Sequence, residues 1–130
     1  AQQIEPLSDG QQRTILLVED ESDVRILATR MLERLGCRVI AAEDAEMALE
    51  LAPVSGKIDV LLTDVVLPGL SSASLYERLL KDVPDLPVIY MSGYGDNSAV
   101  AQQVTAQGAY FVSKPFTPAA LATALESVLK

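Results

Sequence analysis

The chain has 130 residues, of which 49% are hydrophobic, so it is long enough for one domain whose core needs no disulfide or metal. Its formal net charge of -8 argues against nucleic acid as a partner, because such binding depends on neutralising phosphates with lysine and arginine. Cys37 is the one cysteine, which excludes an internal disulfide and fits a reducing compartment. No run approaches the roughly 18 apolar residues of a membrane span, so we expect a cytoplasmic domain without membrane contact.

Residues 1–13 are polar, are broken by Pro6 and Gly10, and lack the periodicity of a helix or a strand. This composition is typical of a flexible linker, and we expect the folded domain to cover residues 14–130. The chain begins with Ala1 in place of Met, which favours a segment cut from a longer protein.

From residue 14 onward, apolar runs alternate with helical patterns. The predicted strands cover residues 14–18, 38–41, 58–63, 87–91 and 109–112. The first predicted helix ends at Gly36, and the next three cover residues 45–51, about 72–81 and about 97–107. The last begins with Thr117 as its N-cap and Pro118 as its first residue. Strict alternation of five strands and five helices predicts an α/β fold with a doubly wound parallel sheet.

Helical periodicity also predicts which apolar side chains of these helices face the core. They are Val24, Leu27, Met31, Leu32, Leu35, Leu75, Leu79, Leu80, Leu121, Leu125 and Val128. We interpret these side chains as packing and assign them no chemistry.

Polar side chains follow four of the five predicted strands. Glu19 and Asp20 come after the first strand, Asp64 after the third, Ser92 after the fourth and Lys114 after the fifth. Functional sites of doubly wound sheets form at the carboxyl ends of the strands, near the point where the strand order reverses. If the sheet is parallel and the central strands are neighbours, three carboxylates, a hydroxyl and an ammonium group meet at one edge.

Such a group of acids needs positive charge. Two carboxylates ~4 Å apart repel by about 4 kcal/mol at an effective dielectric constant of 20, so three of them require compensation. Lys114 supplies one charge, and a divalent ion is the natural second source. The chain has no histidine and only one cysteine, so oxygen ligands favour Mg²⁺, or Mn²⁺, over zinc. Taken singly, Glu19 or Asp20 is equally well explained as a solvated acid or a charge at a helix N-terminus.

Four stretches in chain order carry a family resemblance. They are LLVEDE with its acidic pair, LLTDVVLPG with a central aspartate, VIYMSGY with a small hydroxyl residue, and YFVSKPF with a Lys-Pro pair. Over residues 14–130 the chain resembles the receiver domain of bacterial two-component response regulators, the CheY-like family. The resemblance implies a flavodoxin-like sheet with strand order 2-1-3-4-5.

The polar leader, the MSGY and LTDVVLPG stretches and the finish after the fifth helix look most like the C-terminal receiver of a hybrid sensor histidine kinase. A single-domain regulator and a receiver excised from a longer regulator stay open.

The resemblance implies that Asp64 accepts a phosphoryl group from the phosphohistidine of a histidine kinase or of a histidine phosphotransfer protein. The implied ligands of Mg²⁺ are Asp20, Asp64, the backbone carbonyl of Val66 and, through a water, Glu19. Lys114 and the Ser92 hydroxyl would contact the phosphoryl oxygens. Such a chain is a phosphoacceptor signalling domain that assists its own phosphorylation, and not a conventional enzyme.

Activation in the family involves the hydroxyl residue and an aromatic three positions before the lysine, here Ser92 and Phe111. Tyrosine is commoner at this position, and Phe111 lacks its hydroxyl, so a Phe111 ring rotated inward would be held by packing alone. Phe111 is equally well interpreted as a core aromatic without a role in activation. Tyr110 should face the opposite side of the sheet.

Two positions tune phosphoryl hydrolysis in the family, here Val66 and Tyr94. Because one is apolar and the other bulky, we expect a slowly decaying aspartyl phosphate.

Output partners in the family dock on helix 4, strand 5 and helix 5, here near Ala99, Tyr110 and Leu121. We expect a monomer or a weak dimer. One alternative is a receiver-like interaction module that is not phosphorylated. Another is a Mg²⁺-dependent phosphohydrolase, which would need a second aspartate two residues after Asp64, where Val66 stands.

Overall fold

The computed structural model of the chain describes residues 12–54, 56–65, 71–92, 110–114 and 116–129, with Ser92 described by its backbone alone. The strands are β1 (Thr14–Val18), β2 (Arg38–Ala42), β3 (Val60–Asp64), β4 (Val88–Ser92) and β5 (Tyr110–Ser113). The α-helices of this part are α1 (Ser22–Arg34), α2 (Ala45–Leu51), α3 (Ser72–Asp82) and α5 (Pro118–Leu129). A 3-10 turn, Ala52–Val54, extends α2 through Pro53. The helix predicted over residues 97–107 lies outside the described residues.

The strands form one parallel sheet in the order β2-β1-β3-β4-β5. This order confirms the predicted doubly wound, flavodoxin-like fold, and each predicted strand end lies within two residues of the observed one. Because all strands run the same way, their carboxyl ends share one edge of the sheet, here called the carboxyl edge. Their first residues share the opposite, amino edge.

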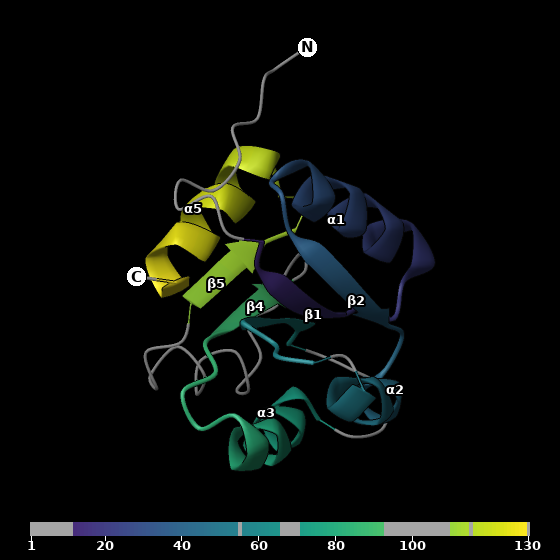
Figure 1. Ribbon diagram of the computed structural model, residues 1–130. Coiled ribbons are helices and arrows are strands. Elements are labelled where there is room, and N and C mark those ends of the chain that lie inside the picture. Colours follow the sequence, from purple (N-terminus) through teal and green to yellow (C-terminus); the bar gives the residue numbers. More distant parts are fainter. Residues whose placement is uncertain (1–11, 55, 66–70, 93–109, 115, 130) are drawn as a thin grey trace.

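Helices cover both faces of the sheet, with α1 and α5 on one side and α2 and α3 on the other (Figure 1). Side chains alternate between the two layers: Ile15 and Leu17 of β1 pack with the α1 and α5 side chains, whereas Leu16 and Val18 pack with those of α2 and α3. A strand covered on both faces is apolar at every position, which explains the continuous apolar run that ends at Asp64.

The end of α1 follows the prediction from Gly36. That residue has a φ of 89°, a left-handed conformation that costs glycine least. Its N–H donates to the Glu33 carbonyl, and the Cys37 N–H donates to the Leu32 carbonyl, both at 3.0 Å. This pair of bonds is the Schellman arrangement, which satisfies the last carbonyls of a helix.

The prediction that Leu27 faces the core was wrong. Leu27 is 50% exposed, and Ala28 is fully buried in its place. At 100° per residue, Ala28 lies near the middle of the stripe that Met31 and Leu32 bound, whereas Leu27 lies beyond the Met31 side of it. Ile26 is also 49% exposed, so the outer surface of α1 carries an adjacent apolar pair.

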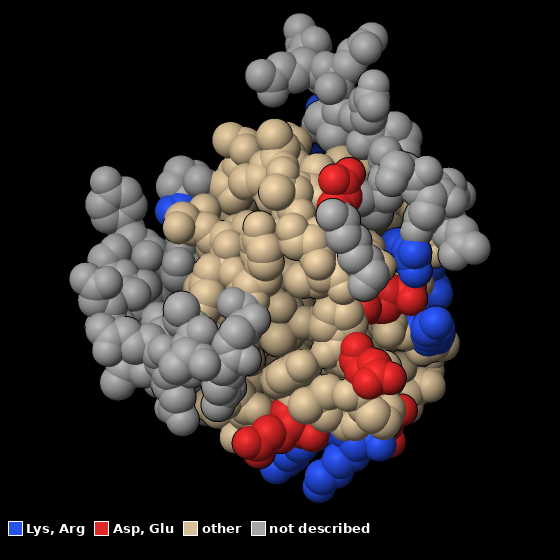
Figure 2. All heavy atoms as spheres, turned by 90° about the vertical axis from the view of Figure 1, so that its left-hand side faces the viewer, with Lys and Arg blue, Asp and Glu red and all other residues tan. Residues whose placement is uncertain are grey.

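The last helix begins as predicted, with the Ala120 N–H donating to Thr117 Oγ1 at 3.1 Å. Leu121 and Leu125 are buried against the sheet, and Glu126 is the only charged residue within α5. Figure 2 views the side of the molecule that carries α5 and β5, and uncharged side chains occupy most of its centre. Among the described helices, none is long and apolar enough to cross a membrane.

Candidate functional site

Three acids meet at the carboxyl edge because β1 and β3 are neighbours. Val18 and Thr63 pair across these strands, so the next residues, Glu19 and Asp64, lie side by side. Carboxylate oxygens of Glu19, Asp20 and Asp64, here called the acid cluster, all lie within 4.8 Å of one another. Glu19 is fully buried and Asp64 is 6% exposed, whereas Asp20 is exposed.

Lys114 joins the acid cluster from the far side of β4. Its Nζ donates to Glu19 Oε1 at 2.8 Å and to Asp64 Oδ2 at 2.6 Å. Burial alone lowers the pKa of Lys114, but the hydrogen bonds to Asp64 and Glu19 outweigh burial and raise that pKa above its ordinary value. The ammonium group is therefore charged at neutral pH and links the ends of β1, β3 and β5.

The backbone around Glu19 is held in place. Its N–H donates to the Ala42 carbonyl at 3.1 Å, and its carbonyl accepts from Arg25 Nη1 at 2.8 Å. Its Oε2 accepts from the Glu21 N–H at 3.1 Å. Burial raises the pKa of Glu19, and the bonds from Lys114 and from the Glu21 N–H offset only part of this rise.

Arg25 was not expected at the site. It lies in the first turns of α1, where the helix dipole disfavours a cation unless the cation has a specific partner. That unusual position, a few residues after the acidic pair, is the sequence signal that could have identified it. Its contact with the Glu19 carbonyl ties α1 to the loop that carries the acids.

The composition of the cluster suits a hard divalent cation. Three carboxylates and one ammonium group leave two negative charges when all are ionised, so a divalent ion would complete the balance. The donors are oxygen atoms, as Mg²⁺ and Mn²⁺ prefer, and the exposed Asp20 leaves a side open to water.

Three other predicted site residues are described in part or not at all. Ser92 is the last residue of β4 and pairs with Ser113 of β5. Met91, the residue before it, pairs with Asp64 of β3, so the Ser92 backbone lies at the carboxyl edge. Its side chain lies outside the described part of the chain. Val66 and Tyr94 also lie outside it, and the roles expected for them stay predictions.

Phe111 packs into the layer formed with α2 and α3. Its ring centroid lies 5.7 Å from that of Tyr90, with the planes tilted by 32°. Burial, together with the nearby Tyr76, raises the pKa of Tyr90 to about 12, so this contact joins two uncharged rings. Tyr110 packs on the opposite face, against the layer of α1 and α5, which confirms the predicted alternation.

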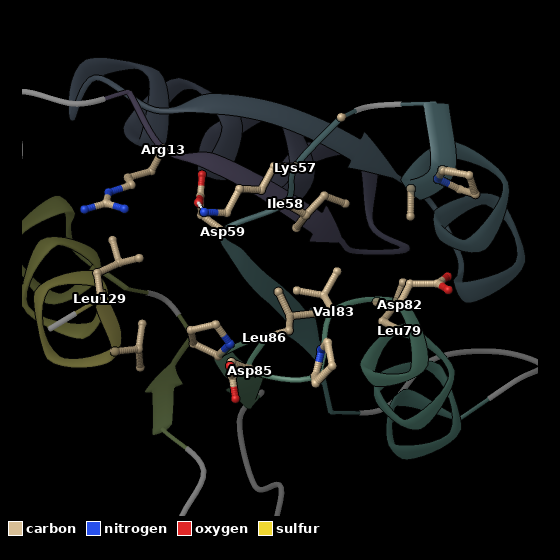
Figure 3. A pocket seen from close by; sticks show the side chains of 16 residues that line it. Arg13, Lys57, Ile58, Asp59, Leu79, Asp82, Val83, Asp85, Leu86 and Leu129 are labelled. Carbon is tan, nitrogen blue, oxygen red and sulfur yellow. Dashed lines mark ion pairs between the residues drawn. The ribbon is translucent and has the colours of Figure 1, made fainter.

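A pocket of about 820 Å³ opens at the other edge of the sheet (Figure 3). Its lining is largely apolar, with charged side chains from Arg13, Lys57, Asp59, Asp82 and Asp85. Arg13 and Asp59 come just before β1 and β3, so this hollow lies at the amino edge. It is separated from the acid cluster by the length of the strands.

Comparison with known proteins gives a consistent assignment. The model of the response regulator receiver domain family matches residues 15–126. The chain is 36% identical over 119 residues to the sensor kinase CckA of Brucella abortus, covering 90% of the chain and 12% of that protein. It is 32% identical over 120 residues to the phosphate regulon transcriptional regulatory protein PhoB of Pseudomonas aeruginosa, covering 91% and 52%. The chain thus spans about half of one relative and a small part of the other.

Solved structures show the same likeness. The receiver domain of the hybrid histidine kinase CckA matches with a TM-score of 0.73 and 31% identity, over 90% of this chain and 99% of that one. A response regulator receiver domain protein from Clostridium thermocellum matches with a TM-score of 0.79 and 28% identity, over 90% and 94%.

Proposed function

The chain belongs to the response regulator receiver domain family, and from this membership we propose that Asp64 accepts a phosphoryl group from a phosphohistidine in a Mg²⁺-dependent reaction. The observation that carries the proposal is the contact of Asp64 with Lys114 at 2.6 Å inside the acid cluster. A receiver is a signalling domain, and the chemistry proposed for this one is its own phosphorylation and dephosphorylation.

In the proposed reaction a carboxylate oxygen of Asp64 forms a bond to phosphorus while the bond from phosphorus to the histidine nitrogen breaks. The electron pair of the broken bond stays on the imidazole. Phosphoryl transfer is accelerated mainly by alignment and by positive charge near the transferred oxygens. The sheet supplies the alignment, because Asp64 is the last residue of a strand buried on both faces. Lys114 supplies a charge that lies against the nucleophile before transfer and can contact the phosphoryl oxygens during it.

The residues present fit Mg²⁺, and we propose that Asp20, Asp64 and the Val66 carbonyl hold it, with Glu19 acting through a water. The ion would supply a Lewis acid to the phosphoryl oxygens. The burial of Glu19 and its bond to Lys114 support an indirect role, because its carboxylate is already occupied by the ammonium group and by the Glu21 N–H.

Receivers exchange phosphoryl groups with histidine kinases or histidine phosphotransfer proteins, and we propose such a partner here. The half-exposed Ile26 and Leu27 lie on α1, whose start adjoins the acid cluster. An exposed apolar pair on a helix that begins at the acid cluster suits the docking of the domain that brings the phosphohistidine. Partners that receive the signal are proposed to dock near α5 and Tyr110. Leu121 is fully buried, so its exposed neighbours, such as Thr123, would make the contacts.

We propose that residues 14–130 are the receiver and residues 1–13 a linker, within the C-terminal part of a hybrid histidine kinase in the cytoplasm. The similarity to CckA, as a protein and as a solved receiver domain, supports this origin. The similarity to PhoB keeps a transcriptional regulator as the second candidate.

Intact mass after incubation with acetyl phosphate and Mg²⁺ tests the proposed function. We expect the wild type to gain one phosphoryl group, about 80 Da, and to gain none when EDTA is present. Asp64→Asn should gain none, whereas the control Asp85→Asn, an exposed aspartate at the amino edge, should gain as much as the wild type. No gain in the wild type, or an equal gain in Asp64→Asn, would reject the proposal in favour of an interaction module that is not phosphorylated.

A further inference from the structure

The residue after the proposed acceptor is held from two sides. The Val65 N–H donates to the Met91 carbonyl at 3.0 Å, which extends the pairing of β3 with β4 one residue beyond the strand. The Val65 carbonyl accepts from Ser72 Oγ at 2.8 Å. Val65 is 3% exposed and Ser72 is fully buried, so both bonds are shielded from bulk water.

Ser72 is the first residue of α3, but it is not the residue that caps the helix. That role belongs to Ser71, whose side chain accepts from the Ser74 N–H. The Ser72 hydroxyl instead bonds back to the end of β3. The bond thus joins the residue that follows β3 directly to the first residue of α3.

We propose that Ser72 is a positioning residue for Asp64, acting through the Val65 carbonyl; this inference rests on the proposed function. The Val65 N–H shares a planar peptide unit with the Asp64 carbonyl, and the Val65 carbonyl belongs to the next unit, so holding both units limits rotation about Val65 and with it the position of Asp64. Asp64 must keep its carboxylate within reach of both Lys114 and Asp20. Misplacing a reacting group by about 1 Å can cost two orders of magnitude in rate.

Removing the hydroxyl in Ser72→Ala leaves the Val65 carbonyl buried without this donor, and the backbone is then expected to shift toward another partner. Loss of an outer partner of a metal ligand typically weakens metal binding by 10–100-fold. We therefore expect Ser72→Ala to bind Mg²⁺ about tenfold more weakly and to accept a phosphoryl group from acetyl phosphate about tenfold more slowly.

Ser127→Ala is the matched control. Ser127 Oγ donates to the Thr123 carbonyl at 2.9 Å, so it makes the same kind of bond, but on the exposed surface of α5. The measurements are calorimetric Mg²⁺ affinity of the unphosphorylated protein and the phosphorylation rate by intact mass. Both are made at a temperature where thermal melts show every variant folded.

The proposal is overturned if Ser72→Ala matches Ser127→Ala in both Mg²⁺ affinity and phosphorylation rate, whatever its melting temperature. A lower melting temperature with unchanged affinity and rate would make Ser72 a purely structural residue. If the wild type binds Mg²⁺ but gains no phosphoryl group, the proposed function fails on its own, and the difference in Mg²⁺ affinity still decides the role of Ser72.

Discussion

Each edge of the sheet pairs a lysine with an aspartate. At the carboxyl edge, Lys114 Nζ lies 2.6 Å from Asp64 Oδ2, and the two side chains are 14% and 8% exposed. At the amino edge, Lys57 Nζ lies 4.0 Å from Asp59 Oδ1, and the side chains are 84% and 14% exposed. The residue types are the same, so any difference in chemistry must come from their surroundings.

The two aspartates differ in the groups that surround them. Asp64 stands next to Glu19 and Asp20, so its edge holds more negative charge than Lys114 can balance. Asp59 Oδ2 accepts from the Thr14 N–H at 2.8 Å, so this carboxylate holds the start of β1 in place. Charges interact more strongly when buried, and an excess of buried charge attracts a cation. The pocket at the amino edge is roomy, but the proposed reaction is assigned to the carboxyl edge, where three acids are concentrated and Glu19 and Asp64 are buried.

The largest expected difference between the edges is catalytic. Lys114→Met should lower the initial rate of Mg²⁺-dependent phosphorylation by about 100-fold, because it removes a cation aimed at the charge that develops in transfer. Lys57→Met should leave this rate unchanged. Time courses of intact mass with acetyl phosphate measure both. Equal rates in the two variants would show that the contact of Lys114 with Asp64 has no part in the reaction.

The second difference is in metal binding. If Mg²⁺ binds the acid cluster, then Mg²⁺ at about 100 times its Kd should raise the free energy of unfolding by about 2.7 kcal/mol. Asp20→Asn and Asp64→Asn should lose most of this gain, whereas Asp59→Asn should retain it. Urea unfolding with Mg²⁺ and with EDTA gives the comparison. A gain that survives in Asp64→Asn and disappears in Asp59→Asn would move the ion to the amino edge.

The fold could be predicted closely because β1 and β3 are buried on both faces, and their apolar runs are bounded by polar residues. Leu27 was placed in the core because it is large and apolar, although the helical period puts the smaller Ala28 nearer the middle of the buried stripe. The convergence of Asp64 and Lys114 was expected from a parallel sheet with neighbouring central strands, and the strand order itself came from the family resemblance.

The contacts that hold the site were harder to predict. Arg25 and Ser72 each donate to a backbone carbonyl, and every residue has one, so even where the position of the donor is unusual, as for Arg25, the sequence does not identify the acceptor. Glu19 and Asp20 are adjacent acids, yet one is buried and the other exposed. That distinction depends on how Lys114 and Ala42 meet Glu19, which only the folded chain shows.

The smallest expected effect comes from a substitution at Tyr90, in the core between the two edges. It should alter the free energy of unfolding and leave the chemistry of both edges intact. Burial raises the pKa of Tyr90 from 10.0 to about 12. Between these values the unfolded chain releases a proton that the folded chain keeps, so the free energy of unfolding falls as pH rises. From pH 10 to 11 this loss amounts to about 1 kcal/mol.

Tyr90→Phe has no phenol to titrate, so it should lack this part of the alkaline loss while its phosphorylation rate at neutral pH stays that of the wild type. Urea unfolding at pH steps above 9 measures the first property, and intact mass measures the second. The difference between the two curves isolates Tyr90, because the two proteins differ at that residue alone. If the free energies of unfolding of the two proteins fall equally at alkaline pH, then Tyr90 is more accessible to water than its exposed fraction of 2% implies. A slower phosphorylation rate would instead show that its contact with Phe111 reaches the carboxyl edge, and the separation between core and edge would fail.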